Sequence, residues 1–290
     1  MISPVALDSL RNRRPEWSPW LEVVDEIVRE TASGRWKAMV PEQPVTGPPR
    51  PLLTGATLMV DGTAVRRLLE RLIETAARNG TPKMATLRSV LRQDVDAARL
   101  FAASIQQKND GITDLAARTG ADGDALQAVV ALVAVPFLHA CHRGWASLVP
   151  STWTEGYCPV CASWPSFAEL RGIERSRYLR CARCGGEWHA QILHCAYCGM
   201  NDHDELVSLV PEKPGSSGAI EACKRCRGYV KAFTRLQGCP PATVMLEDLA
   251  SVNLDLAALA QGYARPAGAG CGIDVTVAAG AGHRFFAWNA

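Results

Sequence analysis

Eight cysteines in the second half of the chain have the types and spacing to do chemistry, because they occur as four Cys-x-x-Cys pairs. The pairs are Cys158/Cys161, Cys181/Cys184, Cys195/Cys198 and Cys223/Cys226. Each pair supplies two thiolates from one tight turn, and two such turns complete a tetrahedral sulfur site for zinc or iron. Pairing neighbours along the chain predicts two metal sites, with nineteen residues between the pairs of the first and twenty-four between those of the second. The first spacing fits the pattern of a metal ribbon, and the second is slightly longer.

Other uses of these pairs are open. An interleaved arrangement would use the same eight residues, and His189, His194 and His203 lie close enough in sequence to be substitute ligands. A redox dithiol is usually a single pair at a helix start in a βαβ setting, which the sequence does not predict here. Metal ligation is therefore favoured over dithiol chemistry, and disulfides are disfavoured if the protein stays in the cytoplasm.

The amino-acid composition indicates a folded protein and gives no sign of nucleic acid or a membrane as its main partner. The chain has 290 residues, of which 48% are hydrophobic and 21% charged, as in an ordinary folded protein. Lysine plus arginine number 31 against 29 acidic residues, too even a balance to indicate nucleic acid or an anionic membrane as the main partner. The N-terminus carries no pattern of a secretory signal, so we expect a cytoplasmic protein. The longest apolar run, 125–141, is shorter than the roughly 20 residues of a membrane span and predicts a buried helix.

The first 150 residues predict a helical domain. In residues 62–80, apolar residues follow the helical i, i+3, i+4, i+7 spacing from Val65 to Ala76, and Asp61 or Thr63 can cap the start. Similar patterns cover residues 16–32, 83–107, 111–119 and 122–147. Nothing in this half resembles a catalytic constellation.

After residue 150, the sequence pattern predicts short strands and turns between the cysteine pairs. We expect a first rubredoxin-like or zinc-ribbon-like metal module over residues 151–192 and a second over 193–240, each a small antiparallel ribbon closed by its metal. A C-terminal helix is predicted over 241–266, with Leu249, Val252, Leu256 and Leu259 on one stripe. No role is assigned to the tail, 267–290. Cys141, Cys239 and Cys271 stand outside the pairs and are expected to be buried small residues or unreactive thiols.

Several of these segments resemble one family. The helical first half is followed by CPVC, RCARCGGEWH, CAYCG, EACKRCRGYVKAF and EDLASVNLDLAALAQGYARP, and this order is similar to that of the bacterial formate dehydrogenase accessory protein FdhE family. The resemblance covers residues 10–266 and is most specific between Cys158 and Arg265. The tail after residue 266 departs from the family pattern.

The resemblance implies a maturation protein that binds the catalytic subunit of respiratory formate dehydrogenases. It also implies that the eight paired cysteines hold two metal ions, with iron favoured and zinc possible. A rubredoxin-like electron carrier is an alternative, and a zinc ribbon that binds nucleic acid is a weaker one, since basic residues exceed acidic ones only by ten to eight between Cys158 and Lys231. We expect no enzyme, because two sites filled by four thiolates leave no position for substrate and no nucleophile–base pair is evident.

Overall fold

The computed structural model describes residues 4–42, 50–109, 111–210 and 218–279. Contacts divide the chain into two units. The sheet unit comprises Met1–Pro15, Pro44–Thr54 and Leu138–Ile273, and the helical unit comprises Glu16–Gln43, Gly55–Phe137 and Asp274–Ala290. The helical first half, the small sheets and the two groups of four cysteines confirm the predicted fold class. The domain ranges expected from the sequence stay a prediction.

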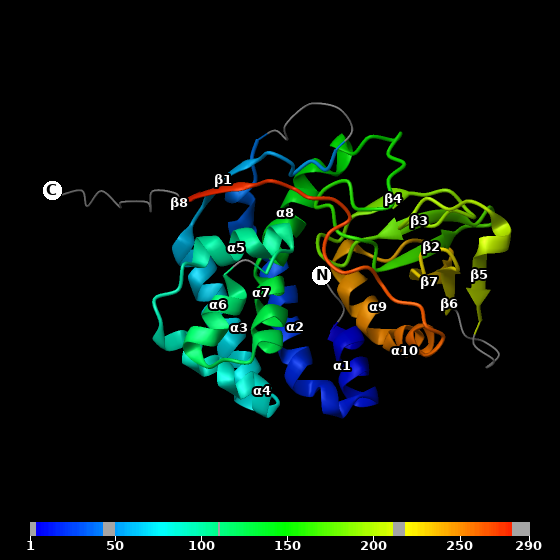
Figure 1. Ribbon diagram of the computed structural model, residues 1–290. Helices are drawn as coiled ribbons and strands as arrows, with labels where there is room; N and C mark the ends of the chain where they lie inside the picture. Colours follow the sequence, from blue (N-terminus) through cyan, green and yellow to red (C-terminus); the bar gives the residue numbers. More distant parts are fainter. Residues whose placement is uncertain (1–3, 43–49, 110, 211–217, 280–290) are drawn as a thin grey trace. The chain divides into compact units, whose positions relative to one another are not determined.

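The helical unit is built from short helices around α3 (Figure 1). Its elements are α2 (Ser18–Ala32), η2 (Gly34–Met39), β1 (Thr57–Val60), α3 (Gly62–Asn79), α4 (Pro82–Ala85), η3 (Thr86–Arg92), α5 (Ala97–Gln106), α6 (Ile112–Thr119), α7 (Gly123–Val133) and β8 (Thr276–Ala279), with η1 (Pro15–Trp17) before α2. The predicted helix over 83–107 is interrupted, because Asp96 begins a new helix by accepting a hydrogen bond from the Arg99 backbone N–H at 3.0 Å.

Helix α3 forms where its sequence pattern predicts. The Asp61 side chain accepts hydrogen bonds from the backbone N–H groups of Thr63 and Ala64, at 2.9 and 3.1 Å, and so caps the helix start. The predicted apolar face is buried, from Val65 (0% exposed) to Ala76 (0% exposed). The burial of this face anchors the helical unit.

A strand from the far end of the chain joins the helical unit. Residues 276–279 form β8, which pairs in parallel with β1 in the register Thr57↔Thr276. Figure 1 shows the two strands side by side although they lie near opposite ends of the sequence. Part of the tail that received no role from the sequence is therefore a structural strand, and residues 280–290 lie outside the described part.

Among the described residues, one helical stretch is long and apolar enough to cross a membrane by length and composition. This stretch, Gly123–Leu148, joins α7, α8 (Val135–Trp145) and η4 (Ala146–Leu148), and is longer than the apolar run named from the sequence. However, 67% of its most apolar window is buried inside the protein. That burial is typical of a core helix.

The sheet unit contains one six-stranded sheet. Its elements are α1 (Pro4–Arg13), β2 (Phe167–Arg171), β3 (Ser176–Arg180), β4 (Glu187–His189), η5 (His203–Glu205), β5 (Leu206–Leu209), β6 (Gly218–Cys223), β7 (Tyr229–Arg235), η6 (Pro241–Thr243), α9 (Val244–Ala250) and α10 (Val252–Ala260). The strand order is β4-β3-β2-β7-β6-β5. Neighbours are antiparallel except at the centre, where β2 and β7 pair in parallel with Phe167 opposite Lys231. The two predicted ribbons thus share a single sheet.

The two faces of this sheet differ, because successive side chains of a strand point to opposite sides. Phe167, Ile220 and Phe233 lie on the face that packs against α9 and α10, where Val244 and Leu254 complete a buried cluster. Figure 1 shows both helices on this side of the sheet. The other face of the sheet carries a cavity, which Leu170, Val230 and Ala232 line.

The C-terminal helix predicted over 241–266 is two helices. Ser251 separates α9 from α10, and its hydroxyl donates to the backbone carbonyls of Glu247 and Asp248. The predicted apolar stripe is wrong, because two of its four residues are exposed to solvent. Leu254 is buried, whereas Leu256 and Leu259 are 61% and 54% exposed.

A buried lysine ties the sheet to these helices. The Lys231 side chain is 0% exposed, and its Nζ lies 2.8 Å from Asp248 Oδ1 and 2.8 Å from Asp255 Oδ2. Arg265 contacts the same two carboxylates at 2.8 and 2.7 Å. Burial alone would raise the pKa of Asp248, but the charges of Arg265 and Lys231 outweigh it and hold that pKa below its ordinary 3.8.

We expect Asp248→Asn to lower the free energy of unfolding by roughly 1.5–3 kcal/mol at neutral pH, because Lys231 loses a charged partner in a buried place. A carboxyl with a lowered pKa stabilises the fold fully above about pH 5, and this contribution disappears as pH falls through the lowered value. The difference between variant and parent should therefore shrink in acid. Urea unfolding between pH 7 and pH 3 measures it, with the exposed Glu174→Gln as control. An equal difference at every pH would contradict the account.

Candidate metal centres

All four Cys-x-x-Cys turns have the same backbone geometry. In each, the N–H of the residue after the second cysteine donates to the carbonyl of the first, at 2.9 to 3.0 Å, as Ala162 does to Cys158 and Arg227 to Cys223. The first cysteine in turn donates its own N–H to the carbonyl five residues later, for example Cys195 to Met200 at 2.8 Å. These paired bonds close a tight loop that turns both sulfurs to one side.

The residue after each pair adopts a left-handed backbone. Gly185 and Gly199 have φ of 75° and 72°, and the non-glycine residues Ala162 and Arg227 have φ of 59° and 58°. Small residues, namely Ala162, Gly185 and Gly199, follow three of the pairs, and this is the sequence signal for such turns. That signal misses Arg227, which is held in place by its side chain: Nε and Nη2 donate to the carbonyls of Gly262 and Gln261, and the guanidinium lies 4.1 Å from the Tyr263 ring centroid.

The turns bring the eight cysteines together in two groups of four. The first group is Cys158, Cys161, Cys181 and Cys184, and the second is Cys195, Cys198, Cys223 and Cys226. Within each group all four Sγ atoms lie within 4.8 Å of one another. Neighbouring turns along the chain therefore meet, and the turns of the two groups are not interleaved.

The sulfur spacing fits a metal ion. Sγ–Sγ distances are 3.5 and 3.6 Å in the first group and 3.6 and 3.8 Å in the second. A tetrahedron with metal–sulfur bonds of about 2.3 Å has edges of about 3.8 Å, whereas a disulfide needs about 2.05 Å. Backbone N–H groups also point at sulfur, from Val160 to Cys158 and from Gly228 to Cys226, both at 3.4 Å. Both groups could hold a metal ion, and their soft donors suit zinc or iron alike.

Helix α8 adds groups beside the first site that the sequence analysis did not name. A Cβ atom placed on Gly185 would lie 2.8 Å from His139 Cε1, and one on Gly186 would lie 3.3 Å from His142 Nδ1. Burial, followed by the charges of Arg143 and His142, lowers the pKa of His139 to about 3, so this imidazole is neutral. The only sequence signal was two histidines three residues apart in an apolar helix, which is equally common in an ordinary core.

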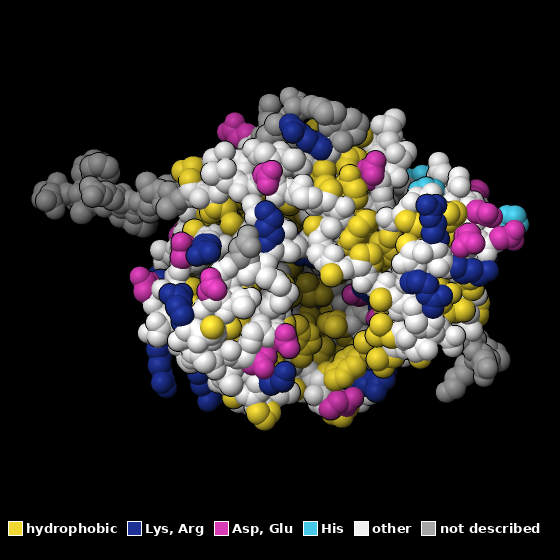
Figure 2. Space-filling model, in the orientation of Figure 1, with side chains coloured by type: hydrophobic (Ala, Val, Ile, Leu, Met, Phe, Trp, Pro, Cys, Tyr) yellow, Lys and Arg dark blue, Asp and Glu magenta, His cyan; other side chains and the backbone are white. Residues whose placement is uncertain are grey.

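The three histidines considered as substitute ligands lie outside both groups of four. The ring of His189 packs against Tyr178 with centroids 5.6 Å apart, and the carbonyl of His194 accepts a hydrogen bond from Arg177. His203 is exposed between Asp202 and Asp204, where these three residues form a third group of possible ligand atoms. Figure 2 shows acidic and histidine side chains together near β5. Exposed acidic groups of this kind are common without a metal, so this third group is not a strong candidate.

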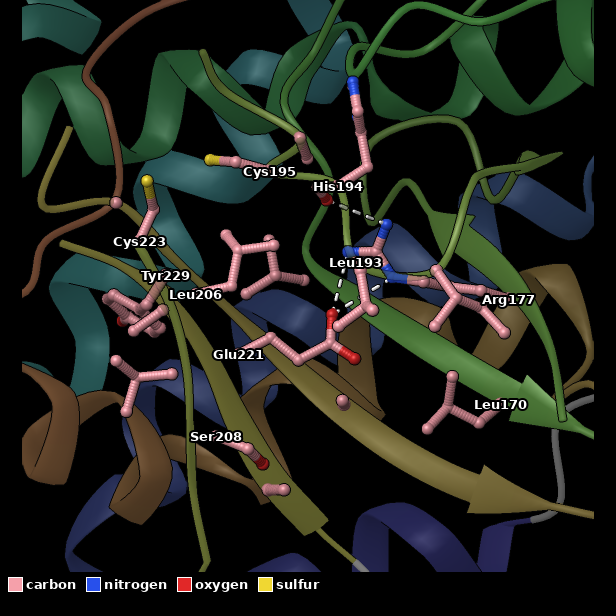
Figure 3. Close-up of a pocket in the computed structure, with 18 of the residues that line it drawn as sticks. Leu170, Arg177, Leu193, His194, Cys195, Leu206, Ser208, Glu221, Cys223 and Tyr229 are labelled. Atoms are coloured by element: carbon pink, nitrogen blue, oxygen red, sulfur yellow. Dashed lines mark hydrogen bonds and ion pairs between the residues drawn. The ribbon is translucent and has the colours of Figure 1, made fainter. Parts of the chain in front are cut away.

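A cavity of about 680 Å³ lies on the sheet face opposite α9 and α10. Its floor includes Leu170, Val230 and Ala232, and Cys195 and Cys223 of the second group also line it. Arg177 of β3 crosses over β2 and β7 to reach Glu221 of β6, with Nη2 2.8 Å from Oε2 (Figure 3). The guanidinium also donates to the carbonyls of Gln191 and His194, and so holds the segment that enters the second group.

The fold and the cysteines define a protein that presents two four-sulfur centres on one sheet. The family model of the FdhE C-terminal domain matches residues 193–269, which contain the second group. In fold, the chain is similar to the crystal structure of the FdhE protein from Pseudomonas aeruginosa, with a TM-score of 0.60 over 90% of this chain and 91% of that one at 22% identity.

Curated proteins similar in sequence to this chain are also FdhE homologs. The FdhE homolog of Aquifex aeolicus is 36% identical over 115 residues, 38% of this chain and 40% of that protein. The homolog of Pseudomonas aeruginosa is 33% identical over 146 residues, 45% of this chain and 47% of that protein. The matches thus span less than half the length of these relatives. Together with the family model and the fold, they confirm the resemblance predicted from the sequence: residues 193–269 match the FdhE C-terminal domain, and the chain is similar in fold to an FdhE protein.

The turn beside His139 provides a test of this geometry. Gly185→Ala should destabilise the sheet unit by about 1–2 kcal/mol for its left-handed backbone and by roughly 1–3 kcal/mol more for the new methyl group, which would lie 2.7 Å from the Pro241 carbonyl oxygen. Gly199→Ala is the matched control, because its methyl group would meet nothing closer than 3.8 Å and it should carry only the first cost. Urea unfolding of the metal-loaded proteins compares them. Equal losses would show that the first group is not packed as described.

Proposed function

We propose that this chain is an accessory protein for the maturation of a respiratory formate dehydrogenase. In this proposal, each group of four cysteines holds one metal ion, with iron favoured and zinc possible. The observation that carries the proposal is the pair of four-sulfur groups on a shared sheet, with edges close to those of a metal–thiolate tetrahedron. The match to the FdhE C-terminal domain and the similarity to curated FdhE proteins support it.

The partner in this proposal is the catalytic subunit of the formate dehydrogenase. The chain binds that subunit before it is fully matured, and the metal centres stabilise the surface that does so. Such a role needs the sheet to keep its shape, and metal–thiolate bonds add to the stability that its apolar cluster against α9 and α10 provides. Apolar side chains are available on the sheet unit, since Ile192 and Leu193 beside the second group are 56% and 59% exposed.

A role without catalysis is part of the same proposal. Four thiolates fill the coordination of a tetrahedral ion and leave no position for a substrate. We further propose that the protein works in the cytoplasm, where thiols stay reduced and available to metal. The even balance of charge supports a protein partner over nucleic acid.

Client binding tests the proposal. Tagged protein should co-purify with the formate dehydrogenase catalytic subunit when both are expressed in a strain that lacks its own FdhE, and formate dehydrogenase activity should be restored. Cys161→Ser with Cys181→Ser, or Cys198→Ser with Cys223→Ser, should each reduce both readouts roughly tenfold or more, because a half-filled site loses its metal.

Cys271→Ser is the matched control, because Cys271 belongs to neither group of four. It should leave both readouts unchanged. If the paired variants, shown to be folded by circular dichroism, still bound the client and restored activity, the metal centres would have no part in the function and the proposal would fail.

A further inference from the structure

The two groups of four cysteines differ in how far they are shielded from solvent. Cys158, Cys161, Cys181 and Cys184 are each 0% exposed. In the second group, Cys195 and Cys223 are buried at 7% and 1%, but Cys198 and Cys226 are exposed. The turns have the same backbone geometry in both groups, so the difference arises from what packs around them.

Separate stretches of the sheet unit cover the first group. The backbone N–H groups of Leu52 and Leu53 donate to the carbonyls of Pro159 and Val160, at 2.8 and 3.2 Å, and so hold a turn of the chain, 51–54, against the first cysteine turn. Gly270 donates to the Ala162 carbonyl at 2.7 Å from another segment. Helix α8 and Pro241 lie against Gly185 of the second turn. Together these segments shield the four sulfurs of the first group from solvent.

The turns of the second group are held by neighbouring segments in a way that leaves two of its cysteines exposed. Tyr197 donates its hydroxyl to the Tyr229 carbonyl at 2.7 Å, and Arg227 fixes the other turn to the end of α10. Cys195 and Cys223 face the cavity that Arg177 spans, while Cys198 and Cys226 face outward. This group is therefore well positioned but open on one side.

We propose that the second group is an exchangeable metal site and the first a permanent structural one. An incoming thiol or other soft donor can reach an ion bound in the second group by displacing Cys198 or Cys226. In that step one metal–sulfur bond to the protein breaks and one to the incoming sulfur forms. The proton of the incoming thiol moves to the released cysteine, and no electrons are exchanged. A closed first group offers no such approach.

This inference rests on the proposed function only in taking both groups to bind metal, and its test needs no client protein. Protein loaded with two zinc ions is treated with excess EDTA in the presence of iodoacetamide. Samples taken over time are digested, and mass spectrometry follows the alkylation of each cysteine. Cys141, which is 0% exposed and outside both groups, reports the opening of the fold.

The four cysteines of the second group should be alkylated at least about tenfold faster than those of the first, as one equivalent of zinc is released. The first group should react no faster than Cys141, and without EDTA both groups should be protected. Equal rates in the two groups, or faster reaction of the first, would overturn the inference and leave the proposed function standing. Conversely, failure of client binding in the cysteine variants would not alter the exchange rates.

Discussion

Eight sulfur atoms drawn together in two groups of four are the constraint on which the sheet unit depends. Thiolates within 4.8 Å of one another repel, and a cation bound between them turns that repulsion into attraction. The backbone is already shaped for this arrangement. Each turn closes with the same two hydrogen bonds, and left-handed residues at 162, 185, 199 and 227 bend the chain so that both sulfurs of a pair face the other pair of their group. A metal ion held in each group would add rigidity to the short strands around it.

The sheet joins the two centres into one body. Each contributes three strands in the same spatial order, β4-β3-β2 and β7-β6-β5, and the parallel pairing of β2 with β7 makes the two halves continuous. Arg177 bridges them on one face through Glu221 and the segment before Cys195. Lys231 and Arg265 fasten the other face to α9 and α10. The two centres therefore lie on one continuous sheet, although they differ in their exposure to solvent.

Local features of this architecture could be predicted from the sequence, and long-range ones could not. The cysteine pairs, the capped amphipathic helix α3 and the glycines after two of the pairs are signals carried within a few neighbouring residues. The strand pairings of Phe167 with Lys231 and of Thr57 with Thr276 join segments far apart in the sequence. The local sequence of one segment does not indicate which other segment it pairs with. The helix breaks at Ser251, whose hydroxyl competes for backbone carbonyls, and beyond the break Leu254 is buried while Leu256 is exposed. The left-handed backbone of Arg227 is stabilised by contacts with residues 261–263. These contacts could not be predicted from the residues next to Arg227 in the sequence.

The first measurement to make is the metal content of the protein purified without oxygen. We expect two ions per chain in the parent and one ion per chain in either Cys161→Ser or Cys223→Ser, because the groups are separate and each needs all four sulfurs. Visible absorption from thiolate to iron would accompany iron, and a colourless protein with two zinc ions would satisfy the same count. Parent protein that contained no metal while its eight paired thiols titrated freely would contradict the account.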